Sequence, residues 1–353
     1  MKLISNIIKY TAVSGILVCS TTVLAGNEDR VGSAGASELL VNPWARSSAW
    51  GSAGIATTRG LEAQFMNIAG VAFTDKTQVK YNSTNWLGSA GISLHSAGIA
   101  QRVGPQGVMA ISVQNFSYGD IDVTTVNIPD GGIGTFSPNK SIVNAGYARE
   151  FSNSIYAGIN LKIINENISN LRANGVAIDA GVNYVTGEQD EMKFGITLKN
   201  VGPTMIFRGD GLSTPIFYQS NGAIANLEQR PASFEIPSLL AMGGSYDFIF
   251  GKNSKLTTAF SFIANSFSND QIAGGLDYGF ASDKAAFNIR FGYVYEESLL
   301  LDQPTTALTG PTAGFSVDIL AGQNKSPIGF EYAARVAGIF GFIHTAGITI
   351  SVK

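Results

Sequence analysis

Segments of about ten residues, in which apolar side chains alternate with polar or small ones, recur along most of the chain. In VAIDAGVNY (176–184), every second side chain from Val176 is larger or apolar, and Ala, Asp, Gly and Asn fill the positions between. The alternation recurs in MKFGITLK (192–199), FNIRFGY (287–293), IGFEYAAR (328–335) and AGITISVK (346–353). Because successive side chains of a strand point to opposite faces, each segment is predicted to be a strand with one apolar face.

About fourteen such strands are predicted, and an even number is typical of single-chain outer-membrane barrels. They start near residues 77, 92, 107, 140, 154, 173, 191, 236, 256, 271, 285, 312, 327 and 343. Every second connection is short, and the long ones, near 119–139, 201–235 and 296–311, all fall in the other set. This sorting favours an all-β, transmembrane antiparallel β-barrel. A soluble β-sandwich is the alternative, since it also has one buried face per sheet.

Composition supports a membrane barrel over other classes. Charged residues make up 14% of the chain, against roughly 25% in soluble domains. After the N-terminal region, no window holds 18 consecutive apolar residues, which disfavours a helical membrane protein. The net charge of −3 argues against nucleic acid as a partner. We therefore predict a β-barrel over residues 77–353, in contact with the lipid bilayer.

The N-terminal residues have the features of a secretory signal peptide. Residues 1–9 carry two lysines, residues 11–23 are mostly apolar, and VLA precedes Gly26. This order matches an n-region, an h-region and a small-residue cleavage site. The apolar run is shorter than the roughly 20 residues that a transmembrane helix needs. Residues 1–25 are predicted to be a signal peptide, and the mature chain is expected in the bacterial outer membrane.

Residues 26–76 precede the first predicted strand and contain NPWARSSAWGSAGIATTRG (42–60). A barrel of about fourteen strands has a backbone diameter near ~28 Å, so its lumen must hold water or a plug. We predict that residues 26–76 form an N-terminal luminal hatch, with a flexible linker as the alternative. Trp44 and Trp50 would fill volume, and Gly51 and Gly54 would let the backbone pass close to the wall. Three charged residues of the hatch, Arg46, Arg59 and Glu62, are expected to pair with inward charges of the barrel. Examples of such inward charges are Asp179, Asp247, Asp277, Asp318 and Glu331.

Several short motifs resemble the PorV/PorQ family, which is itself similar to FadL-type fatty-acid transporters. They are AR at 45, WGSAG at 50, MNIAGVAF at 66, GVAIDAGVNY at 175, KNVGPTMIF at 199 and GGSYDF at 243. The resemblance implies a 14-stranded barrel with a hatch that includes Asn67 and Gly70, working in the type IX secretion system. Its implied partners are the C-terminal signal domains of secreted cargo proteins, or components of the attachment complex. The family's Asn-Pro-Ala-Gly box reads Asn67-Ile68-Ala69-Gly70 here, without the proline.

Catalytic chemistry has little support in the sequence. His95 and His344 lie inside predicted strands at opposite ends of the chain, and no nucleophile elbow, zinc motif or P-loop is present. Asp120 and Asp122 are possible calcium ligands, but a pair of carboxylates is more typical of a turn. We predict a protein that is not an enzyme and that has no cofactor and no metal site.

Two functions remain open from the sequence. The connection at 201–235 is long and carries apolar and aromatic residues, so it is predicted to bind a protein partner. The candidate contacts are Met205, Phe207, Phe217 and Tyr218, although the same residues would also suit the lumen mouth or an aromatic girdle. The alternative function is a FadL-like channel for hydrophobic small molecules. Charges on the predicted inner faces, such as Lys162, Lys193 and Lys199, disfavour an apolar path.

Overall fold

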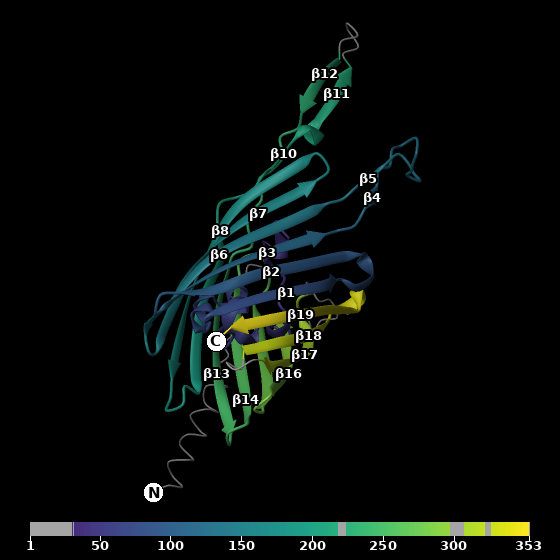
Figure 1. The fold of residues 1–353 in the computed structure, drawn as a ribbon. Helices are drawn as coiled ribbons and strands as arrows, with labels where there is room; N and C mark the ends of the chain where they lie inside the picture. The colour runs from purple at the N-terminus through teal and green to yellow at the C-terminus, as the bar shows by residue number, and fades with distance from the viewer. Residues whose placement is uncertain (1–29, 31, 218–223, 297–306, 322–325, 353) are drawn as a thin grey trace.

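The computed structural model describes residues 30, 32–217, 224–296, 307–321 and 326–352 (Figure 1). Fourteen of its strands form a closed antiparallel barrel. These are β1 (Thr77–Trp86), β2 (Ile92–Val103), β3 (Gly107–Ser117), β6 (Asn139–Ser152), β7 (Ile155–Ile168), β8 (Leu171–Thr186), β9 (Met192–Val201), β13 (Leu239–Phe250), β14 (Ser254–Asn265), β15 (Gln271–Ala281), β16 (Ala285–Glu296), β17 (Gly310–Ala321), β18 (Ser326–Val336) and β19 (Phe342–Val352). The predicted signal peptide, residues 1–25, lies outside the described residues.

The ring closes where β1 pairs with β19, from Thr77 opposite Val352 to Asn85 opposite His344. Neighbours in sequence pair around the rest of the ring, and β8 pairs with β9 through an irregularity near Ile178. A closed ring leaves no sheet edge, so the sandwich alternative is wrong. The predicted strand starts are confirmed, and the largest difference is at β13, which begins at Leu239 and not near 236.

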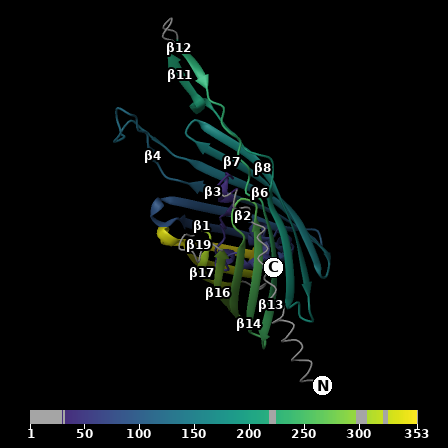
Figure 2. The ribbon, with the colours of Figure 1, turned by 180° about the vertical axis from the view of Figure 1, so that it is seen from behind.

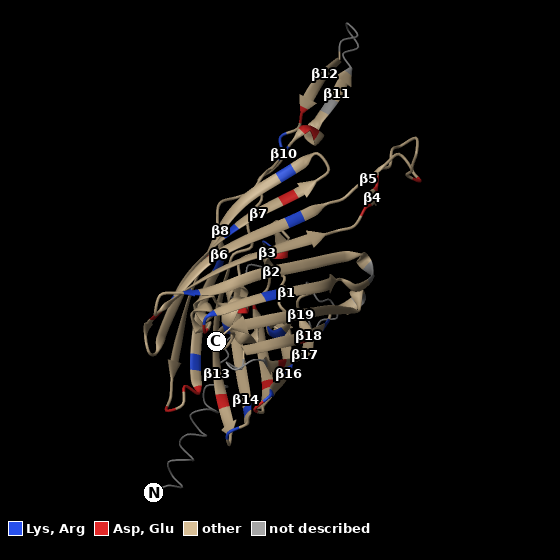
Figure 3. Cartoon of the chain, viewed as in Figure 1, with Lys and Arg blue, Asp and Glu red and all other residues tan. Residues whose placement is uncertain are grey.

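The alternation of side chains places the apolar face outward. In β8, Val176 and Ile178 are 44% and 52% exposed, whereas Asp179 and Asn183 are 2% and 1% exposed. Charged residues are sparse along the wall strands (Figure 3). The apolar outer band has the character of a surface in contact with lipid, and the polar faces line the lumen, as expected for a membrane barrel.

The connections sort by end, as predicted. The C-terminal ends of β3, β9 and β16 and the N-terminal ends of β6, β13 and β17 lie at one end of the barrel, here called the loop end. The short connections that follow β2, β6, β8, β13 and β15 lie at the other, the turn end, as does the C-terminal end of β17. The hairpin of β11 (Ser213–Phe217) and β12 (Ile224–Glu228) and the segment that carries β4 (Ile121–Asp122) and β5 (Thr135–Phe136) project at the loop end (Figures 1 and 2). Other short pieces at the loop end are η6 (Gly88–Ala90), between β1 and β2, β10 (Phe207–Arg208) and η7 (Asp210–Leu212), which precede the hairpin, and η9 (Gly338–Phe340), between β18 and β19.

Residues 32–76, here called the inner segment, lie within the barrel (Figure 1). They form η2 (Ser37–Leu40), α2 (Ala45–Ser48), η3 (Ala53–Ile55), η4 (Gly60–Glu62), α3 (Ala63–Met66) and η5 (Ile68–Phe73). The element α2 contacts β17 to β19, η3 contacts β9 and β13 to β16, η4 contacts β1 and β2, and η5 contacts β3 and β6 to β8. These four short helices together reach every strand of the barrel. In the described part of the chain, no helix has the length and apolar character needed to cross a membrane.

Candidate functional site

A cluster of five charged side chains joins the inner segment to the wall. Arg46 of α2 places Nε 2.5 Å from Oε2 of Glu331 and Nη2 2.5 Å from Oδ1 of Asp318. Lys80 of β1 lies between the carboxylates of Glu331, at 2.9 Å from Oε1, and Glu62. Because every cation in the cluster faces a carboxylate, the ion pairs offset the loss of hydration on burial.

The expected pairing of charges in the inner segment with inward charges of the wall is confirmed for Arg46. Burial lowers the pKa of its guanidinium, but the carboxylates of Glu331 and Asp318 outweigh burial and raise the pKa above its ordinary value. The expectation is wrong for Arg59, whose guanidinium lies 4.3 Å from the ring centroid of Phe73. The other inward acids are satisfied by wall cations, in the pairs Lys162–Asp179, Lys193–Asp247 and Arg290–Asp277 at 2.7, 2.6 and 3.0 Å.

The two tryptophans of the inner segment are buried at different places on the wall. Trp44 is fully buried beside Ala100 and Ala110 of the wall, and the Nζ atom of Lys80 lies 5.9 Å from a ring centroid of Trp44. Trp50 is 5% exposed and packs with Val294 of β16. Both rings therefore fill space between the segment and the barrel.

The glycines of the inner segment have two different roles. Gly51 has a φ of 65°, and a Cβ there would lie 2.7 Å from Cγ2 of Val294. A Cβ at Gly54 would lie 2.5 Å from Oγ1 of Thr58, and one at Gly70 would lie 2.2 Å from the Thr58 carbonyl oxygen. Gly51 thus permits close approach to the wall, whereas Gly54 and Gly70 let the segment pack on itself.

Asn67 connects the motif Asn67-Ile68-Ala69-Gly70 to the wall. Its Oδ1 accepts a hydrogen bond from the backbone N–H of Ala69 at 3.2 Å and so caps η5. Its Nδ2 donates to Oδ1 of Asn183 at 2.7 Å and to the carbonyl oxygen of Val182 at 3.2 Å. One side chain therefore both starts a helix and fixes that helix against β8.

Sequence reasoning missed the glycines on the wall that receive the inner segment. A Cβ at Gly292 of β16 would lie 2.2 Å from the carbonyl carbon of Trp50. A Cβ at Gly181 of β8 would lie 2.1 Å from Oδ1 of Asn67. The available signal was a glycine at an inward position of a strand, which marks close approach of another backbone.

The predicted partner-binding residues lie in different surroundings. Met205 is fully buried, and its backbone exchanges hydrogen bonds with Phe234. The half-buried ring of Phe207 lies 5.5 Å from that of Phe234. Phe217 is the last residue of β11, and Tyr218 lies outside the described residues. The burial of Met205 removes it from the predicted binding surface, because it has no area to offer to a partner.

Cavities lie on both sides of the inner segment. One of about 220 Å³ is at the turn end, and charged side chains line most of it, including Arg46, Arg59, Lys193 and Asp277. One of about 140 Å³ is at the loop end, and apolar side chains line more of it. The inner segment thus separates two lumen spaces of different polarity.

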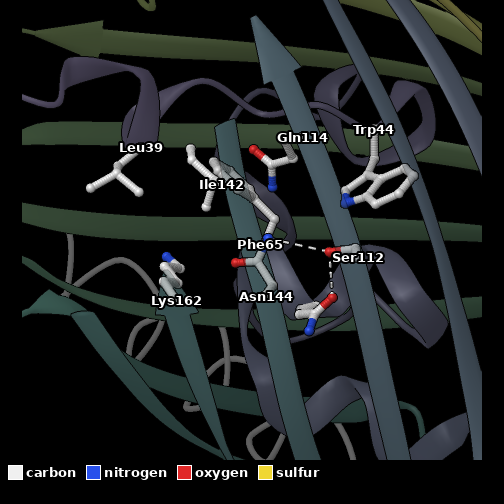
Figure 4. Close-up of a pocket in the computed structure, with 9 residues that line it drawn as sticks. Leu39, Trp44, Phe65, Ser112, Gln114, Ile142, Asn144 and Lys162 are labelled. Carbon is white, nitrogen blue, oxygen red and sulfur yellow. Dashed lines mark hydrogen bonds between the residues drawn. The ribbon is translucent and has the colours of Figure 1, made fainter. Parts of the chain in front are cut away.

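A third cavity, shown in Figure 4, is small and polar. Its volume is about 10 Å³, and Trp44 and Phe65 of the inner segment contribute to its lining. Within it, Oγ of Ser112 donates to Oε1 of Gln64 at 2.7 Å and accepts from Nδ2 of Asn144 at 3.3 Å. This volume suits at most a single water molecule, so the cavity is too small for an organic ligand.

The histidines and acidic residues considered for chemistry have structural surroundings. Nδ1 of His95 lies 3.1 Å from the hydroxyl oxygen of Tyr81, and Nδ1 of His344 lies 2.6 Å from that of Tyr332. Asp120 accepts a hydrogen bond from Ser137. Over the residues that the structure describes, no group of three or more His, Cys, Asp or Glu side chains is placed to hold a metal ion.

Solved structures with a similar fold are outer-membrane barrels of the FadL type. The toluene transporter TodX of Pseudomonas putida matches with a TM-score of 0.53 at 11% identity, over 88% of this chain and 97% of that chain. The toluene transporter TbuX of Ralstonia pickettii matches with a TM-score of 0.50 at 13% identity, over 86% and 96%. A Pseudomonas aeruginosa FadL homologue matches at 0.49 and 10% identity, over 86% and 96%. No curated protein matches the chain in sequence.

The family comparison agrees with the motifs. The model of the family described as type IX secretion system protein PorV matches residues 24–265. This range covers the inner segment and the strands up to β14. The family and the similar barrels are secretion or transport proteins, and their location is the outer membrane. The chain belongs to the PorV family, and it is an outer-membrane component of the type IX secretion system.

Proposed function

We propose that the protein binds secreted cargo, or other components of the secretion system, through loops that face the cell exterior. The observation that carries this proposal is the β11–β12 hairpin. Among the described strands, β11 and β12 pair only with each other. Ile216, Ile224 and Leu227 of the hairpin are 38%, 63% and 55% exposed. Apolar residues exposed on a projecting element are typical of a surface that binds another protein.

The hairpin is joined to the barrel wall at its base, and no other described strand pairs with its two outer edges. At the base, Phe207 and Arg208 pair with β8, and Met205 pairs with Phe234. Beyond the base, a two-stranded sheet is only marginally stable in water by itself. Its unpaired backbone groups offer hydrogen bonds to a strand of a partner. These features support docking of a folded protein domain at the loop end.

We also propose that residues 26–76 act as a hatch that closes the barrel lumen, and the contacts of the inner segment support this. Its helices contact every strand of the barrel, and the ion pairs of Arg46 and Glu62 fix it to three strands, through Lys80 of β1, Asp318 of β17 and Glu331 of β18. A lumen filled in this way leaves the loops as the surface available to a folded protein. The hatch would then keep the membrane sealed while cargo binds outside.

The test compares two sets of substitutions in native outer membranes. Changing Ile216, Ile224 and Leu227 to Ser removes the apolar surface of the hairpin. The matched control changes three exposed apolar residues near β4 and β5 to Ser, namely Val126, Ile128 and Ile133. Affinity purification should recover at least tenfold less cargo with the hairpin variant than with the control. Recovery of cargo at the wild-type level would reject the hairpin as the docking site.

A channel for hydrophobic small molecules is the alternative function. It is favoured by the fold shared with proteins described as toluene transporters. Because the sequence identity to these two transporters is 11–13%, the comparison supports a shared fold and not a shared substrate. The same purification separates the two functions. If the protein is only a channel, it should co-purify with small apolar molecules, and neither the wild-type protein nor the control variant should recover cargo protein.

A further inference from the structure

The outer face of β7 and β8 changes from apolar to polar side chains near the loop end. Ile163 and Val176, which lie opposite each other in the register, are 45% and 44% exposed. The next outward pair toward the loop end is Asn165 and Asn174, and Arg172 follows on β8. Because the apolar outer band meets the hydrocarbon of the bilayer, this change places Arg172 at the level of the lipid headgroups.

A second arginine lies opposite Arg172 on this outer face. In the pairing of β10 with β8, Arg208 is the register partner of Arg172, and both side chains are exposed. Side chains directly opposite each other on antiparallel strands have Cβ atoms about 4.5–5.5 Å apart. Both guanidinium groups can therefore reach the same small anion.

The two arginines line one open cavity of about 470 Å³. Asn174 of β8 and Thr204, in the stretch that leads into β10, line the same cavity. Thr204 and Arg208 alternate along the chain with Met205 and Phe207, which pack into an interior cluster. The cavity therefore opens on the outer face of the barrel and not on the lumen.

The positive charge at this cavity has no counter-charge in the described ranges of the chain. Like charges directly opposite each other in a sheet destabilise the pairing. Neither Arg172 nor Arg208 makes an ion pair with a described residue, and Asp210, the acid nearest to Arg208 in sequence, is not within ion-pair distance of either. An anion bound between the two guanidinium groups would replace their repulsion with attraction.

We infer that this cavity binds the phosphate group of a lipid headgroup, with Arg172 and Arg208 as its two cationic contacts. A guanidinium donates paired hydrogen bonds to phosphate oxygens. The side chains of Asn174 and Thr204 supply further donors at the same cavity. Two arginines and two neutral donors thus suit a phosphate that carries three free oxygens.

The position of the cavity favours a lipid over a soluble phosphate. Val176 lies four residues from Arg172 along β8, which is about 13 Å in a strand. A lipid with its phosphate at Arg172 would therefore lay its acyl chains along the exposed apolar side chains of β7 and β8. The cavity is lined by β8 and by a stretch that ends at Gly209, before the β11–β12 hairpin begins. This site is thus separate from the proposed docking of a protein at the hairpin.

The test uses the folded, purified barrel in a non-ionic detergent, with phosphatidic acid and phosphatidylcholine of the same acyl chains as probes. Phosphatidic acid ends in a free phosphate, whereas choline neutralises and covers the phosphate of phosphatidylcholine. Native mass spectrometry at equal lipid concentrations should show a bound fraction at least fivefold larger for phosphatidic acid.

Substitutions then locate the bound lipid. Arg172→Gln and Arg208→Gln should each lower the bound fraction of phosphatidic acid at least fivefold. The matched control is Arg230→Gln, which removes an exposed charge of the loop end outside the cavity and should leave the bound fraction unchanged. Because the two arginines repel each other in the free protein, both cavity variants should keep the heat-modifiable migration of the wild-type barrel on a gel.

Three results would overturn the site. The first is equal binding of the two lipids to the wild-type protein, a comparison that needs no variant. The second is wild-type binding of phosphatidic acid in both cavity variants. The third is displacement of phosphatidic acid by an equal concentration of inorganic phosphate, which would assign the cavity to a free anion and not to a lipid. Since no cargo protein is present, the outcome is independent of the docking proposal.

Discussion

Arg46 donates a hydrogen bond from Nε to Oε2 of Glu331 across 2.5 Å, although the two residues are 285 positions apart. Glu331 also accepts from Lys80, which belongs to the first barrel strand. The two contacts of Glu331 together link the inner segment to β18, near the end of the barrel sequence, and to β1, at its beginning. We expect the segment to reach its final position only when β1 and β18 are both in place.

The first prediction concerns this cluster. Arg46→Met should lower the free energy of unfolding by about 3 kcal/mol, because Asp318 loses its cationic partner in a largely buried site. The matched control is Arg30→Met, since Arg30 makes an ion pair of the same length, 2.5 Å, with the exposed Glu235. Exposed pairs contribute about 0–1 kcal/mol. Urea unfolding of the purified barrel measures both, and equal losses would show that burial of the cluster adds nothing.

The second prediction concerns the space that the wall leaves for the inner segment. Gly292→Ala should displace the segment, because the added Cβ would overlap the backbone of Trp50, which no side-chain rotation can relieve. Gly274→Ala is the control, since nothing lies within 4 Å of its Cβ position. Limited trypsin digestion should cleave after Arg46 or Arg59 in the first variant only. Protection of both variants would mean that the contact at Gly292 is not needed.

The third prediction concerns Asn67. Asn67→Asp should destabilise the barrel by about 3 kcal/mol, because the Nδ2 donor is replaced by an oxygen that faces the acceptors of Val182 and Asn183. Asn253→Asp in the exposed turn between β13 and β14 is the control. The temperature at which the heat-modifiable band disappears on a gel measures the difference. A shift shared by the two variants would indicate an effect of charge alone.

The strands were predictable from the sequence, because their alternation has a period that the pleated backbone imposes. In β8 and β9 the residues predicted to face outward, such as Val176 and Phe194, are exposed, and Asp179 and Lys193 are buried. The end at which each connection lies was predictable for a related reason. Successive strands of an antiparallel barrel run in opposite directions, so the connections between them alternate between the two ends. The sequence therefore carried enough local information to specify the class and the closure of the fold.

The interior was less predictable, because its contacts join residues that are far apart in sequence. Arg46 was expected to meet an inward carboxylate, and it does so at Asp318 and Glu331. Arg59 was expected to do the same, but Phe73 lies beneath its guanidinium. No periodic pattern distinguishes these two arginines. The choice of partner depends on the path of the inner segment, which consists of short helices without a repeating pattern of side chains.

The last prediction concerns Ile68, which stands where the family motif has proline. Ile68 is the first residue of η5, and Asn67 before it has φ −152° and ψ 111°. An extended residue followed by the first residue of a helix is the setting that proline prefers, and the N–H that proline lacks has no partner within the helix there. Ile68→Pro should therefore preserve the fold.

The reference for Ile68→Pro is Ile68→Ala, because both changes remove the contact of the Ile68 side chain with the wall near Gly146. Proline restricts the unfolded chain, so Ile68→Pro should be more stable than Ile68→Ala by about 0.4–1 kcal/mol. Urea unfolding of the two variants in the same detergent measures this difference. A proline variant that is less stable than the alanine variant would mean that the backbone at Asn67 and Ile68 differs from the extended-to-helical geometry on which the prediction depends.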